Sequence, residues 1–87
     1  MREIFINLGF DNEELEDLLI KYEYIGVYKL EKIILLLSRY GCNKIFLKEL
    51  IINRTKVFEY DVDQLEYILD AIVSNGDCIE ETLLEIL

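Results

Sequence analysis

The side chains of this chain that could do chemistry are almost all carboxylates. There is no histidine, and the two cysteines, Cys42 and Cys78, stand far apart without a CxxC spacing. An active site would therefore lack its usual base, and a zinc site would lack its usual ligands. We expect a protein that is not an enzyme and holds no cofactor, with both cysteines free and buried rather than joined.

Asp61, Asp63 and Glu66 could be interpreted as a metal cluster, because oxygen ligands of this kind suit a hard cation. Their spacing lacks the glycine turn and the twelfth-position glutamate of an EF-hand. A helix cap at Asp61 followed by a solvated helix face accounts for the same residues. The acids of residues 11–17 fit the same explanation. The sequence therefore predicts no metal site.

The acidic side chains are unevenly distributed along the chain. The formal net charge is −9, yet residues 18–56 hold eight basic and only three acidic side chains. Residues 57–87 hold nine acidic and no basic ones. Self-repulsion of this size is typical of a segment that gains solubility from it or that meets a basic partner. The candidate partner-binding residues are Glu59, Asp61, Asp63, Glu66, Asp70, Asp77, Glu80 and Glu81.

The basic middle of the chain offers an alternative, which is binding to nucleic acid. Lys29 and Lys32 are spaced i, i+3, and Lys44 and Lys48 are spaced i, i+4, so each pair could contact phosphates from one side of a helix. Against this, the net charge repels a polyanion beyond the Debye length of about 8 Å. We therefore expect a protein partner and keep nucleic acid as the less favoured one.

Composition favours a single all-α domain over residues 1–87. The chain has no proline and four glycines, and 53% of its residues are hydrophobic. The stretch from Tyr28 to Gly41 is apolar around most of a helix, which predicts a core helix covered by protein on both sides. It is too short to span a bilayer, and the N-terminus lacks a secretory signal. We expect a cytoplasmic protein without a membrane segment.

Capping signals divide the chain into short helices. The residues placed to begin helices are Asp11 or Asn12, Asn43, Asp61 and Asp77, and those placed to end them are Gly9, Gly41 and Gly76. Shifting the chain by 32 residues aligns Gly9 with Gly41, Leu18 with Leu50, and Leu30 with Val62, whereas Cys42 meets Cys78 at 36. This pattern predicts an internal repeat. The predicted parts are a helical stub (1–9), two repeat units (10–41 and 42–76) and a terminal helix (77–87).

The expected architecture is thus a small right-handed, solenoid-like helical-repeat array, or a compact bundle of about five helices plus the stub. Two stretches of the chain resemble a known helical repeat: L-G-F-D-N-E-E-L-E-D-L-L-I-K-Y and K-V-F-E-Y-D-V-D-Q-L-E-Y-I-L-D-A-I. They are similar to the helical repeats of the mitochondrial transcription termination factor (mTERF) family. That family usually has a proline in its connectors and binds nucleic acid through a basic concave surface, whereas this chain has no proline and is strongly acidic. The resemblance implies the fold but not the function.

The function that these observations favour is that of a small acidic protein-binding module. Inhibitors, immunity proteins and antitoxins of this kind occupy a basic surface of a partner such as a nucleic-acid enzyme, and some imitate nucleic acid with carboxylates. The aromatic residues Tyr24, Tyr28, Phe58 and Tyr60 lie in or beside connectors, where they serve either an interface or packing within the repeat. A homodimer is a third reading, because the incomplete first unit leaves an apolar end.

Overall fold

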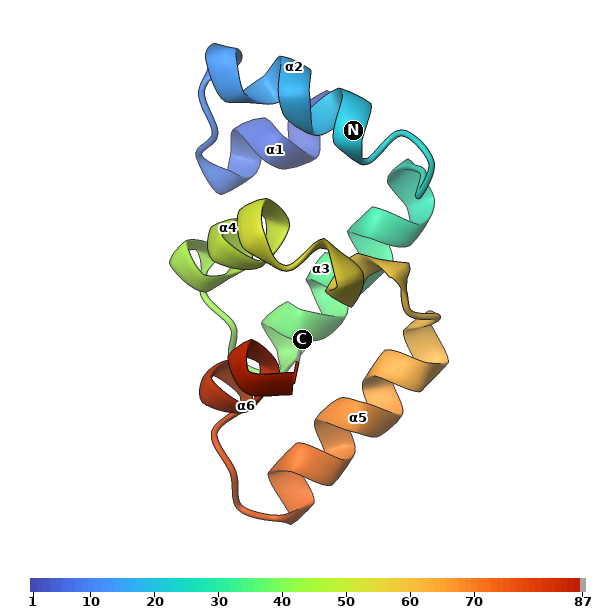
Figure 1. Ribbon diagram of the computed structural model, residues 1–87, viewed down its shortest axis with the longest axis vertical. Helices are drawn as coiled ribbons and strands as arrows, with labels where there is room; N and C mark the ends of the chain where they lie inside the picture. Colours follow the sequence, from blue (N-terminus) through green and yellow to red (C-terminus); the bar gives the residue numbers. More distant parts are fainter. Residues whose placement is uncertain (87) are drawn as a thin grey trace.

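The computed structural model describes residues 1–86, and all their regular structure is helical. This confirms the predicted all-α class, with the stub and the five expected helices (Figure 1). The elements are α1 (Arg2–Leu8), α2 (Asn12–Lys21), α3 (Val27–Arg39), α4 (Lys44–Asn53), a 3₁₀ turn η1 (Thr55–Glu59), α5 (Val62–Ser74) and α6 (Ile79–Ile86).

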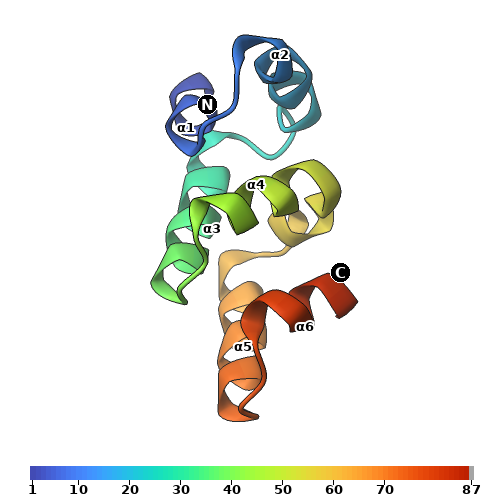
Figure 2. The ribbon, with the colours of Figure 1, turned by 90° about the vertical axis from the view of Figure 1, so that its left-hand side faces the viewer.

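The helices form two columns along the 39 Å long axis of the molecule. Figure 2 shows α1, α3 and α5 following one another on one side, with α2, α4 and α6 on the other. Helix α3 packs against α5, α1 packs against α2 and α4, and α5 packs against α6. Contacts thus run along one column, from α3 to α5, and between the two columns, and the core lies between the columns.

The three helices of one column end in the same hydrogen-bonded turn. In each turn a backbone amide donates over 3.1 Å to the carbonyl five residues earlier, and these pairs are Phe10–Phe5, Cys42–Leu37 and Asp77–Ile72. The residue before each donor is a glycine with φ between 77° and 99°. This left-handed conformation strains any residue with a Cβ atom, so glycine fixes where each helix stops.

The helices begin in less uniform ways than they end. Asp11 and Asn43 each accept a hydrogen bond of 2.9 Å from the amide three residues later, as predicted for caps of α2 and α4. Asp61 precedes α5, but its side chain makes no capping hydrogen bond. Asp77 does not open α6 as expected, because its amide closes the turn after α5. The carbonyl of Cys78 instead accepts the first bond of α6, from Thr82.

The repeat spacing differs between the two columns, which corrects the predicted alignment. Helices α2 and α4 are offset by 32 residues, as the sequence comparison indicated, but α3 and α5 are offset by 35. Leu30 therefore corresponds to Leu65 rather than to Val62, and Cys42 corresponds to Asp77 rather than to Cys78. The three extra residues lie in the second connector, which contains η1. Apolar residues recur every three or four positions in any amphipathic helix, so leucine spacing alone did not reveal the shift.

A row of aromatic rings forms the upper core of the molecule. The ring centroid of Tyr22 lies 5.8 Å from that of Phe5 and 5.6 Å from that of Phe58, and all three side chains are fully buried. The buried hydroxyl of Tyr22 donates to the carbonyl of Ile51 over 2.5 Å. Phe58 thus serves packing, whereas Tyr24 and Tyr28, also in connector regions, are exposed.

Helix α3 is less enclosed than its composition predicted. Leu30, Ile33 and Leu37 are buried, but Leu35 is 58% exposed and Tyr28 is 70% exposed. The expectation that protein covers this helix on both sides is wrong for that face. The reason is that α3 belongs to one of only two columns, so one side of the helix faces the core and the other faces solvent (Figure 2).

Candidate functional site

Three carboxylates form an acidic stripe along the outer face of α5. Asp63, Glu66 and Asp70 are spaced i, i+3 and i+7, which places them on one side of the helix, and all three are exposed. They belong to the partner-binding set expected from the sequence, and the fold gathers them on one element. We call these three residues the α5 stripe.

Tyrosine hydroxyls bind two carboxylates of the predicted set. Tyr40, which follows α3, donates to Asp70 of the α5 stripe. Tyr24 donates to Glu59 over 3.0 Å. The hydrogen bond to Asp70 raises the pKa of Tyr40, the charge of Glu66 adds to the rise, and Arg39 opposes it. Each contact joins segments more than 29 residues apart, so it orients a carboxylate that still faces water.

The other predicted acids lie at the two ends of α5. Glu59 and Asp61 precede the helix and are exposed. Asp77 and Glu80 line a hollow of about 390 Å³ beside Tyr40, between the turns that follow α3 and α5. Glu81 is exposed in the first turn of α6. The predicted acidic surface is therefore one central stripe with smaller groups at either end.

Both cysteines line that same hollow, and neither is in a disulfide. Cys42 is buried, as expected, but Cys78 is exposed, which corrects the expectation for it. Burial raises the pKa of the Cys42 thiol to about 11, and the negative charge of Glu80 contributes to the rise. The sequence did not indicate this proximity, because it depends on how the two turns stack.

Two of the four lysines proposed for nucleic acid are bound within the fold. Lys48 donates to the carbonyl of Gly9 over 3.3 Å and lies 5.0 Å from the ring centre of Phe10. Lys29 donates to the carbonyl of Glu59 over 3.0 Å. Lys21 makes an equivalent bond of 2.8 Å to Ile52. The acceptors lie at the ends of α1, η1 and α4, where helix carbonyls lack intrahelical donors and attract cations.

The other two lysines of that set, Lys32 and Lys44, lie on different helices. Lys32 is exposed on α3, with its ammonium 4.4 Å from the ring centre of Tyr28. Lys44 is exposed at the first residue of α4. Each predicted lysine pair thus lies on one helix. Within residues 1–86, one member of each pair binds a backbone carbonyl and the other, Lys32 or Lys44, does not.

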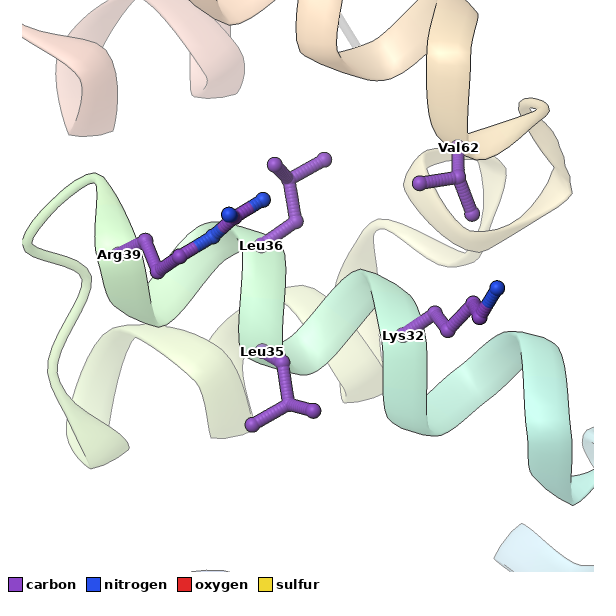
Figure 3. Close-up of a pocket in the computed structure, with 5 residues that line it drawn as sticks. All are labelled: Lys32, Leu35, Leu36, Arg39 and Val62. Carbon is purple, nitrogen blue, oxygen red and sulfur yellow. The ribbon is translucent and has the colours of Figure 1, made fainter.

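A groove of about 430 Å³ runs between α3 and the start of α5, and the sequence analysis missed it. Lys32, Leu35, Leu36, Arg39 and Val62 line it. Figure 3 shows Lys32, Leu36 and Arg39 extending from α3 toward the side on which Val62 lies. The sequence signal for this groove was the mixture of basic and apolar residues on α3. The same mixture is expected of a core helix whose two ends are solvated.

Within residues 1–86, no group of three or more potential ligand side chains is arranged to hold a metal ion. None of the described helices is both long and apolar enough to cross a membrane. The chain matches no protein-family model, no curated protein and no solved structure. The resemblance to mTERF-type repeats therefore stays an expectation from the sequence.

Proposed function

We propose that this chain is a non-enzymatic protein-binding module that uses the α5 stripe to occupy a basic surface of another protein. The observation that carries the proposal is the exposure of Asp63, Glu66 and Asp70 on one helix face, within a segment that has no basic side chain. A basic cleft of a nucleic-acid enzyme is the kind of surface that such a stripe fits. The module then acts as an inhibitor, immunity protein or antitoxin does.

The contacts of the lysines support this choice over nucleic-acid binding. Lys29 and Lys48 donate to backbone carbonyls, so binding of phosphates would compete with bonds that join neighbouring helices. Binding a basic partner through the α5 stripe would not require breaking such a bond. Asp70 accepts a hydrogen bond from Tyr40, but its carboxylate can accept further hydrogen bonds. Electrostatic attraction would add mainly to the association rate and to the choice of partner.

The test is affinity capture from cells of the source organism with matched charge variants. The stripe variant carries Asp63→Lys, Glu66→Lys and Asp70→Lys. The control carries Glu13→Lys, Glu16→Lys and Asp17→Lys on α2, which are also exposed and change the net charge by the same amount. We expect a protein that the wild type and the control retain and that the stripe variant loses.

The affinity of that protein for the wild-type chain should then fall steeply with added salt, because exposed charge pairs are screened. Equal binding by the stripe variant and the wild type, or an affinity that does not respond to salt, would contradict the proposal. A gel-shift assay at low salt tests the alternative. Retardation of nucleic acid that Lys32→Glu and Lys44→Glu abolish would favour nucleic acid as the ligand.

A further inference from the structure

The groove between α3 and α5 lies between a basic edge and an acidic edge. The basic edge is Lys32 and Arg39 on α3, seven residues and about 10 Å apart along the helix. Glu66 and Asp70 follow Val62 at i+4 and i+8 on α5, so the helical repeat places them on the same side of α5 as Val62, and we call them the acidic edge. Tyr40, the residue after Arg39, donates a hydrogen bond to Asp70, so the two edges approach each other where α3 ends. The groove is thus dipolar across its width.

Apolar side chains line this groove. Leu36 is almost fully buried and Val62 is half-buried, and both line the floor. Leu35 also lines the groove and is 58% exposed, and Figure 3 shows its side chain leaving α3 on the side away from Val62. Tyr28, four residues before Lys32, continues the stripe of exposed side chains on α3. An apolar strip with charged margins is the usual anatomy of a protein interface.

We propose that this groove is the interface of a twofold-symmetric dimer of the chain. A half-turn about an axis that runs along the groove exchanges its two edges, so the basic edge of each copy faces the acidic edge of the other. A twofold axis across the groove would instead bring like charges together. The surface is therefore self-complementary in one orientation, as an isologous interface requires.

The size and charge of this side of the molecule allow such a dimer. The molecule measures 39 × 22 × 20 Å, so one full side offers about 800 Å², which is what a standard interface takes from each partner. The acids of α2 lie at the opposite end of the stack from α5 and α6 (Figure 1). At physiological salt, charges more than about 8 Å apart are largely screened, so the two edges dominate the encounter.

The dimer does not depend on the proposed function, although it uses part of the same stripe. Glu66 and Asp70 face the basic edge of the second copy in the dimer, and they face the basic surface of the partner in the proposed function. The two states are therefore mutually exclusive at these residues. The test below uses the purified chain alone, so its failure would leave the proposed function standing.

The experiment is charge-swap complementation followed by sedimentation equilibrium. One variant carries Lys32→Glu and Arg39→Glu, and a second carries Glu66→Lys and Asp70→Lys. We expect the wild type to change from monomer to dimer as the protein concentration rises from about 5 to 500 µM. Each variant alone should associate at least about tenfold more weakly, because like charges then face each other. An equimolar mixture of the two should regain association as a heterodimer.

The control variant carries Lys44→Glu and Lys56→Glu, which change the net charge equally at exposed positions outside the groove. It should dimerise nearly as the wild type does. Circular dichroism checks that each variant is folded. Two single-substitution variants, Lys32→Glu and Glu66→Lys, repeat the test with half the change in charge. A wild type that stays monomeric, reversals without effect, or a mixture that does not associate would overturn the proposal.

Discussion

The lysines of the middle of the chain and the carboxylates of α5 make different kinds of contact. Lys21, Lys29 and Lys48 each reach a backbone carbonyl of another helical segment, so their charges take part in holding the stack together. Asp63 and Glu66 of the α5 stripe face water instead. These lysine charges therefore serve the packing of the helices, whereas Asp63 and Glu66 on the outer face of α5 stay exposed.

The packing of the two regions differs in the same way. The region of α1, α2, α4 and η1 contains the aromatic row of Phe5, Tyr22 and Phe58, all fully buried. Helix α5 packs one side with aliphatic residues and leaves Tyr67, 77% exposed, on the other. Stability should thus depend more on the first region, and four experiments test this difference.

The largest expected effect is that of Phe58→Ala, which removes the ring at the end of the aromatic row. We expect a loss of about 3–5 kcal/mol in the free energy of unfolding, because the side chain is fully buried and leaves a cavity. Tyr67→Ala on α5 is the matched control and should change it by no more than about 0.5 kcal/mol. Urea denaturation measures both. Similar losses would show that the two regions are equally important for stability.

The second experiment compares the thiols of the two equivalent turns. At pH 8, a pKa of about 11 leaves the Cys42 thiol roughly a hundredfold less ionised than a cysteine at the ordinary value of 9.0. Cys42 is also buried and Cys78 is exposed. Mass spectrometry after iodoacetamide treatment should show rapid labelling of Cys78 and slow labelling of Cys42. Rapid labelling of Cys42 in Cys78→Ser would mean that its turn opens readily.

The third experiment uses pH to probe the aromatic row. Burial raises the pKa of Tyr22 above its ordinary value of 10.0, so the folded state keeps a proton that the unfolded state loses above pH 10. The contribution of this group to stability should not change with pH below 10, and above pH 10 stability should fall by about 1.4 kcal/mol per pH unit.

Tyr22→Phe should lower stability at pH 7 by about 1 kcal/mol, through loss of the bond to Ile51, and it should reduce the alkaline slope. Tyr24 and Tyr40, whose pKa values are also raised, account for the slope that remains. Thermal unfolding between pH 7 and 11 provides the comparison. An unchanged alkaline slope in Tyr22→Phe would mean that the buried hydroxyl does not govern it.

The smallest effects test the two kinds of charge directly, and they should have opposite signs. Lys48→Met should destabilise by about 0.5–1 kcal/mol, because it removes a cation from the end of α1 and from the ring of Phe10. Glu66→Gln should stabilise by about 0.2–0.5 kcal/mol, because it relieves repulsion from Asp70 one turn away. Both values come from urea denaturation at low salt. Stabilisation by Lys48→Met would refute the structural role of that lysine.

Local signals predicted the helices well because they act within a few residues. The glycines at 9, 41 and 76 ended the helices where the sequence suggested, since each left-handed turn needs only its own backbone. The caps at Asp11 and Asn43 were equally local. The greater length of the second connector was not predicted. Its three added residues leave the apolar periodicity of the following helix intact, so no local pattern reveals them.

The sequence by itself determined the helical class, the turn positions and the one-sided charge of residues 57–87. The tertiary structure decided which charges remain free, because the carbonyls that bind Lys29 and Lys48 lie 30 and 39 residues away along the chain. It also decided that Leu35 is exposed and that Lys32 and Arg39 face Val62 across a groove. Helical periodicity fixes which residues share a face, but only packing between helices fixes what that face meets.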